Sequence, residues 1–117
     1  MEFLVRFEVA IPPELSAADL EAMMAEERKR GQSLWASGQL VRLWRVPGTR
    51  ASVGLYDFPD ATALHAQFST MPLFPHMRVH SVEPLAVHPA EAERRAGAAG
   101  DGAAGDKAAG DPVAAPA

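Results

Sequence analysis

The stretch QLVRLWRVPGTRASVGLYD, residues 39–57, contains two apolar runs separated by a short turn. Residues 39–46 and 51–57 are rich in the branched and aromatic side chains that favour β-strands. The segment PGTR, residues 47–50, has the proline and glycine that are typical of a tight turn. We therefore predict a β-hairpin in the middle of the chain.

A strand and a long helix are predicted before this hairpin. Large apolar side chains recur at every second position over residues 2–11, which is the period of a half-buried strand. Residues 16–37 contain no proline, and Ser16 followed by Asp19 is a weak form of the N-terminal capping box. Because Gly38 is typical of a helix end, we expect the helix to stop there.

A second helix and a last strand are predicted after the hairpin. Asp60 can cap a helix that ends at Pro72 and whose apolar residues have helical spacing, namely Leu64, Phe68 and Met71. Residues 77–87 have the composition of a strand. The order predicts an α+β, ferredoxin-like βαββαβ fold, an antiparallel sheet with two helices on one face. No element is left to cover the other face, which predicts a homo-oligomer.

Length and composition set the domain organisation. A chain of 117 residues with 48% hydrophobic content is the size of one domain with a modest core. We predict that this domain spans residues 1–95. Residues 96–117 repeat alanine, glycine and aspartate, with Val113 as the one large apolar side chain. Such low complexity predicts a disordered tail.

Cysteine content and charge exclude several classes of protein. The absence of cysteine excludes disulfides, a thiolate nucleophile and cysteine-ligated metals. A net charge of −4 with interspersed acids and bases argues against nucleic acid as a partner. Charged residues interrupt the apolar N-terminus, unlike a signal peptide or a membrane span. We expect a cytoplasmic protein that does not bind membranes.

Glu27 is a charged residue on an otherwise apolar face of the first predicted helix. On a helical wheel it lies in the middle of an apolar stripe formed by Leu20, Met23, Met24, Gly31 and Leu34. A buried, unpaired carboxylate is costly, so Glu27 should form an ion pair, line a pocket or carry its proton. An ion pair with Arg28, Arg45 or another base and a role in acid/base catalysis both remain open at this point.

The other polar residues give weaker signals. Arg42 and Arg45 lie on opposite faces of one strand, so at most one of them shares the side of Glu27 and could bind a carboxylate. The alternative for either is an exposed arginine. The four histidines lack the spacing of metal ligands, and no glycine-rich phosphate loop, nucleophile elbow or dinucleotide motif is present. We expect neither a metal nor a cofactor.

Several motifs together resemble muconolactone Δ-isomerase over residues 1 to about 90. They are the Met-x-Phe-x-Val start with Pro12, Glu26-Glu27-Arg28, Leu43-Trp44-Arg45 with Gly48, Asp57, Leu64-His65, Pro72-Leu73-Phe74-Pro75 with Met77, and His88-Pro89. The resemblance implies a ferredoxin-like fold, a large and often decameric homo-oligomer, and an enzyme without a cofactor. Its implied reaction is isomerisation of muconolactone to 3-oxoadipate enol-lactone, in the β-ketoadipate pathway of aromatic catabolism.

The resemblance and the position of Glu27 together suggest roles for the site residues. Glu27 would remove and return a proton and so move the C=C bond of the small-molecule lactone. The remaining residues would bind or surround the substrate, with Arg45 or Arg28 on its carboxylate or carbonyl oxygen, Trp44 and Phe74 as pocket walls, and Ser52 and His65 as further contacts. No metal is implied.

The chain departs from the family pattern after the hairpin turn. Where the family tends to have Tyr-Ala-Asn-Tyr-Ser, this chain has Arg50-Ala51-Ser52-Val53-Gly54. Losing an amide and two rings changes both the hydrogen bonds and the volume of a pocket, which is how specificity usually changes on a retained fold. Two alternatives stay open, an isomerase or cyclase acting on another lactone or a polyketide, and a non-catalytic ligand-binding oligomer.

Overall fold

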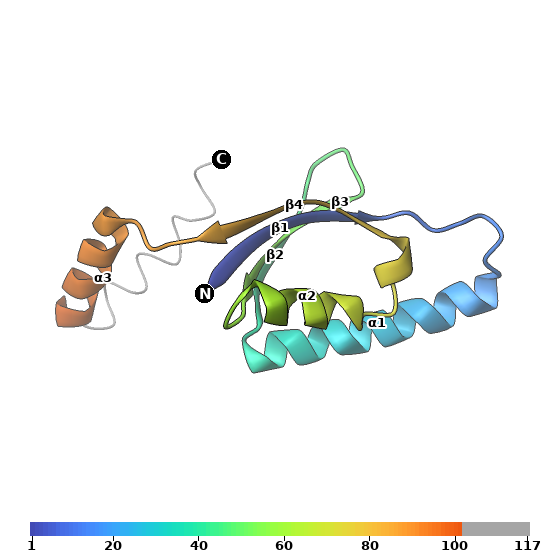
Figure 1. The fold of residues 1–117 in the computed structure, drawn as a ribbon, viewed down its shortest axis with the longest axis horizontal. Helices are drawn as coiled ribbons and strands as arrows, with labels where there is room; N and C mark the ends of the chain where they lie inside the picture. The colour runs from blue at the N-terminus through green and yellow to red at the C-terminus, as the bar shows by residue number, and fades with distance from the viewer. Residues whose placement is uncertain (102–117) are drawn as a thin grey trace. The chain divides into compact units, whose positions relative to one another are not determined.

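The computed structural model describes residues 1–101 of the chain. Residues 1–85 form one compact unit that contains a four-stranded antiparallel sheet and two helices (Figure 1). Its elements are β1 (Glu2–Val9), α1 (Ala17–Ser37), β2 (Leu40–Arg45), β3 (Ala51–Asp57), α2 (Ala61–Ser69), the 3₁₀ turn η1 (Phe74–His76) and β4 (Met77–Leu85). The strands are ordered β2-β3-β1-β4 in the sheet. The predicted ferredoxin-like βαββαβ order is therefore confirmed.

The helix ends agree with the expected caps. The Ser16 side chain accepts a hydrogen bond from the Asp19 amide at 3.1 Å, and Asp60 accepts one from the Ala63 amide at 2.8 Å. At the other end of α1, Gly38 has φ 79° and donates its amide to the Trp35 carbonyl at 3.1 Å. A positive φ favours glycine, which is why α1 ends at this residue.

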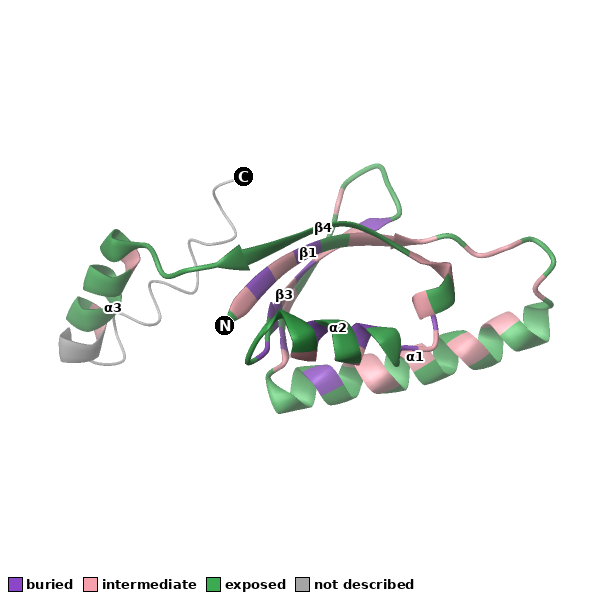
Figure 2. Ribbon diagram, viewed as in Figure 1, coloured by how far each residue is buried: buried purple, intermediate pink, exposed green. Residues whose placement is uncertain are grey.

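The core lies between the two helices and the face of the sheet that they cover (Figure 2). It consists of Phe3, Val5, Leu34, Leu40, Tyr56, Phe58, Leu64, Phe68 and Met71. Phe3 and Val5 are 1% and 0% exposed, because alternate residues of β1 point to the helix side. The Phe68 ring stands edge-on to Phe7 and Tyr56, with centroids 6.3 and 5.0 Å apart.

A register shift in β2 decides which of its side chains reach the helix side. The shift lies between Leu40 and Arg42, after which Trp44 pairs with Val53, and Arg45 pairs with Ser52. Arg45 consequently points to the helix side, whereas Trp44 points to the open face. There the Arg42 guanidinium stacks over the Trp44 ring at 5.1 Å. No helix of residues 1–85 covers this open face (Figure 1).

Beyond residue 85 the structure describes one further helix, α3 (Pro89–Asp101), which belongs to a separate unit. Glu91 accepts hydrogen bonds from both Arg94 and Arg95 within this helix, and these bonds lower the pKa of Glu91 to about 2. The sequence patterns did not predict α3, which overlaps the start of the expected tail. The rest of that tail, residues 102–117, lies outside the described residues, so the boundary at residue 95 and the disorder stay predictions.

None of the described helices combines the length and apolar character needed to cross a membrane.

Candidate active site

Two adjoining hollows lie between α1 and the sheet. One, of about 370 Å³, is lined by Glu27, Arg28 and Tyr56, and the other, of about 410 Å³, by Arg45 and Arg50. Both are also lined by Phe7, Val9, Ser52 and Leu73. Because they share these four residues, we treat them as one cleft and call it the α1 cleft.

Glu27 is half-buried on the sheet side of α1, at the position that the helical wheel predicted. Its Oε1 atom accepts a hydrogen bond from the Leu73 amide at 3.0 Å. None of the ion pairs formed within the described residues involves Glu27. The structure therefore places Glu27 in a pocket, which was one of the expected possibilities. It contains no ion pair between Glu27 and Arg28 or Arg45.

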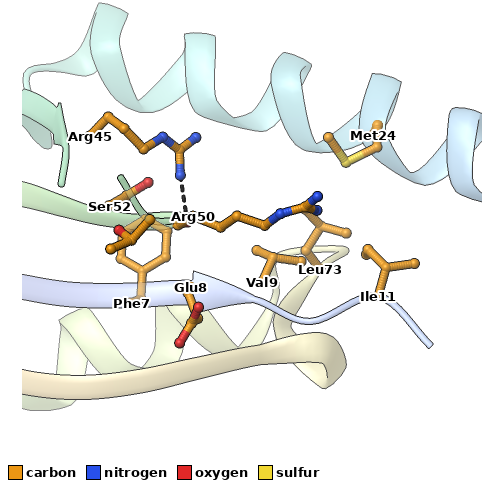
Figure 3. Close-up of a pocket in the computed structure, with 10 residues that line it drawn as sticks. Phe7, Glu8, Val9, Ile11, Met24, Arg45, Arg50, Ser52 and Leu73 are labelled. Carbon is orange, nitrogen blue, oxygen red and sulfur yellow. Dashed lines mark hydrogen bonds between the residues drawn. The ribbon is translucent and has the colours of Figure 1, made fainter. Parts of the chain in front are cut away.

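Two arginines come from the β2–β3 hairpin at the other end of the α1 cleft (Figure 3). The Arg45 guanidinium donates to the carbonyl oxygens of Arg50 and Ala51, so it braces the hairpin. The Arg50 side chain extends along the cleft toward Leu73, and its guanidinium makes no hydrogen bond or ion pair with the described residues. Glu8 also borders this end, but its carboxylate binds His80 at 2.8 Å. Arg50 is thus a cation without a protein partner in this part of the chain.

Tyr56 of β3 places a phenol in the same hollow as Glu27. Tyr56 is only 5% exposed. This burial and the negative charge of Glu27 both raise the pKa of Tyr56. The ring lies across Gly54, where an added Cβ would stand 2.4 Å from the ring atom Cε2. The hydroxyl forms no hydrogen bond within the described residues.

The α1 cleft contains four of the predicted site residues, Glu27, Arg28, Arg45 and Ser52. The other three lie elsewhere. Trp44 is on the open face of the sheet, since its position in β2 alternates with that of Arg45. His65 and Phe74 line a separate, apolar hollow of about 410 Å³ between α2 and β4. The structure therefore does not bring these three side chains to Glu27.

Arg50 and Tyr56 were not among the predicted site residues. Arg50 stood out in the sequence as a departure from a family pattern, and Tyr56 as one apolar residue of a strand. The available signal for Tyr56 was Gly54, because a glycine inside a strand often marks a close approach of another group.

The arrangement suits a small acidic ligand that must lose a proton. One hollow of the α1 cleft offers the Glu27 carboxylate, the Tyr56 hydroxyl and the Arg28 guanidinium, and the other offers the guanidinium groups of Arg45 and Arg50, with the Ser52 hydroxyl shared by both. The walls between them are apolar, which strengthens electrostatic interactions with a bound ligand. Within the described residues, no cluster of three histidine, aspartate or glutamate side chains could hold a metal ion.

Comparisons with known proteins agree on one family. Residues 1–91 match the family model described as "Muconolactone delta-isomerase". Muconolactone Delta-isomerase of Cupriavidus pinatubonensis is 38% identical over 90 residues, which cover 77% of this chain and 97% of that protein. The Pseudomonas aeruginosa enzyme of the same name is 34% identical, covering 77% and 93%. A crystal structure of muconolactone isomerase superimposes with TM-score 0.70 at 34% identity, covering 76% of this chain and 92% of that one.

The environment of Tyr56 predicts an unusual titration. Tyr56 is the one tyrosine of the chain, so the absorbance of its phenolate can be followed directly. Because its pKa is raised, the native protein should show no phenolate near pH 10, where an unfolded tyrosine is about half ionised. Above that pH the unfolded state loses the proton first, so stability should fall as pH rises. Alkaline titration of native and urea-unfolded protein tests this, and overlapping curves would contradict it.

Proposed function

This chain belongs to the muconolactone Δ-isomerase family, and we propose that it moves the C=C bond of muconolactone with Glu27 as the acid/base group. The observation that carries the proposal is the Glu27 carboxylate, which is half-buried, free of ion pairs with the described residues and open to the α1 cleft. A carboxylate in such surroundings can accept a proton and return it.

The reaction needs one proton to leave and return. Glu27 takes the proton from the ring carbon next to the lactone oxygen, and the C–H electron pair spreads over the conjugated system onto the carbonyl oxygen. The same group then returns the proton to the carbon next to the carbonyl, which moves the double bond. The proton that leaves is therefore balanced by the proton that returns, and no other reactant is consumed.

The Leu73 amide supports this use of Glu27. Its hydrogen bond at 3.0 Å fixes one carboxylate oxygen, Oε1, and leaves the other for the substrate. Because the bond ties α1 to the segment after α2, the carboxylate is held before the substrate arrives. Such positioning lowers the entropic cost of reaching the reactive geometry.

The arginines at the other end of the α1 cleft would bind the substrate carboxylate. Arg45 already has part of its guanidinium engaged by the hairpin, whereas Arg50 has none of its donors engaged by described residues. We therefore assign the main contact with the carboxylate to Arg50, with Arg45 and Arg28 as further cations.

Arg50 also favours a second candidate function. The same proton shift could act on another carboxylated lactone whose shape or charge matches an arginine at this position. Isomerisation of muconolactone compared with related lactones separates the two candidates. Binding of these lactones without turnover would instead support the non-catalytic alternative.

We also propose that the protein is a cytoplasmic homo-oligomer that associates through the open face of its sheet. Trp44 is 39% exposed there, and the neighbouring Leu4, Val53 and Leu55 are apolar and only half-buried. An exposed apolar sheet face is a typical subunit interface.

Replacing Glu27 with glutamine tests the acid/base role. Glu27→Gln keeps an oxygen for the Leu73 amide but cannot take up the proton, so kcat should fall by about 10²–10⁴-fold. Formation of the enol-lactone from muconolactone gives the rate. Glu26→Gln, on the exposed neighbour in α1, is the matched control and should retain the rate. An unchanged rate in Glu27→Gln would discard the mechanism and keep the activity.

Removing the Arg50 guanidinium tests carboxylate binding. Arg50→Ala should raise KM by about 10–100-fold, the loss expected for a charged hydrogen bond, with a smaller effect on kcat. Arg42→Ala removes an arginine from the open face and should leave KM unchanged. Steady-state kinetics of both variants decide the question. Equal KM values for Arg50→Ala and the parent would assign the carboxylate to another residue.

The mass of the particle tests the oligomer. Light scattering should give a multiple of the 12.5 kDa chain, and Trp44→Glu should reduce that multiple by placing a charge on the open face. Trp35→Glu is a matched control, because Trp35 is 47% exposed but lies on α1. A monomeric parent protein, or a Trp44→Glu variant of unchanged mass, would contradict this interface.

A further inference from the structure

The hydroxyl of Tyr56 has no protein partner among the described residues, although the residue as a whole is buried. The side chain is only 5% exposed, yet its oxygen forms no hydrogen bond with the residues that the structure describes. No buried side-chain oxygen or nitrogen of the described residues lacks a hydrogen bond, so the unbonded Tyr56 oxygen keeps access to the open space beside it. Since Tyr56 lines the hollow that also holds Glu27, its hydroxyl is available to whatever occupies that hollow.

Gly54 makes room for this phenol. A Cβ at position 54 would stand 2.4 and 2.9 Å from the ring atoms Cε2 and Cζ and 3.0 Å from the hydroxyl oxygen of Tyr56. Gly54 is not among the glycines with positive φ, which are Gly38 and Gly48. The glycine is therefore needed for space rather than for backbone conformation. It is also one of the positions at which the chain departs from the family pattern.

The ring of Tyr56 is held firmly in this place. Phe68 packs edge-on against it, with centroids 5.0 Å apart and planes at 72°. Phe3 and Leu40, both buried, are its register partners on the two neighbouring strands. A donor fixed by its surroundings pays no reorganisation cost when charge develops nearby.

The hydroxyl stays a neutral donor over the working pH range. Burial and the Glu27 carboxylate both raise the pKa of Tyr56, so the phenol keeps its proton. Tyr56 can thus donate a hydrogen bond to a ligand in the hollow, while Glu27 accepts a proton from the same ligand.

We infer that Tyr56 is a second catalytic residue, whose hydroxyl donates a hydrogen bond to the lactone carbonyl oxygen of the substrate as negative charge develops there. The inference rests on the proposed isomerase function. In the step concerned, the substrate C–H bond breaks, its proton goes to Glu27, and its electron pair moves onto the carbonyl oxygen. Tyr56 donates its hydrogen bond but keeps its proton, and the charge leaves the oxygen when Glu27 returns the proton to carbon.

Tyr56→Phe is the direct test, because it removes the hydroxyl and keeps the ring that packs against Phe68. Loss of one donor to a developing oxyanion should lower kcat by about 10–10³-fold and change KM by less than about threefold. The pH profile of kcat should keep its shape, since Glu27 is unchanged. Circular dichroism and the thermal midpoint check that the variant is folded.

A second measurement uses the unmodified protein. Because Tyr56 is the one tyrosine, binding of a saturated, unreactive lactone carboxylate should shift the tyrosine absorption band through the new hydrogen bond. An unchanged band at saturating ligand would overturn the inference without relying on any variant.

The kinetic outcomes separate this inference from the proposed function. An inactive parent protein means that the proposed function fails. An active parent with Tyr56→Phe within about twofold of its kcat means that Tyr56 does not stabilise the charge. A lower kcat with a shifted pH profile means that Tyr56 acts through Glu27 rather than on the substrate, which also overturns the inference.

Discussion

A carboxylate on the sheet side of a packed helix has to find hydrogen bonds, because burying an unpaired charge costs several kcal/mol. Glu27 meets this requirement with the Leu73 amide, 46 residues further along the chain. The bond fixes the segment after α2 against α1, and that segment supplies Leu73 and Met71 to the walls of the α1 cleft. This one contact therefore sets the orientation of the carboxylate and ties two walls of the cleft to each other.

The β2–β3 hairpin contributes cationic and hydroxyl groups to the cleft, and strand alternation decides which of its side chains do so. After the register shift in β2, every second residue of β2 and β3 faces α1, which places Arg45, Ser52 and Tyr56 on one side. A one-residue slip would send them to the open face and bring Trp44 inward. The turn then adds Arg50, so the hairpin supplies two arginines to the cleft, whereas Glu27 and Arg28 come from α1. The contribution of the hairpin to the α1 cleft follows from the backbone register.

The elements were predictable because their signals are local. Ser16, Gly38 and Asp60 mark helix ends, alternation marks the strands, and the helical wheel placed Glu27 on the inner face. Strand alternation could also have separated Trp44 from Arg45, because neighbouring residues of a strand point to opposite faces. The site of His65 was not predictable in this way, because a residue's cavity depends on packing between elements far apart in sequence. The same holds for Tyr56, whose environment is created by Gly54 and Phe68 together. Helix α3 was missed because its alanine- and glycine-containing end resembles the low-complexity residues after it.

The charge coupling between Glu27 and Tyr56 gives the pair a property that neither has alone. In the resting enzyme, the negative carboxylate adds to burial in raising the pKa of Tyr56. In the proposed mechanism, that negative charge disappears when Glu27 takes the substrate proton, and the phenol then becomes more acidic. A more acidic phenol is a stronger hydrogen-bond donor. In this mechanism the change would coincide with the arrival of the electron pair at the carbonyl oxygen, so the transition state would receive a stronger hydrogen bond than the bound substrate. A stabilisation that is larger in the transition state than in the ground state accelerates the reaction.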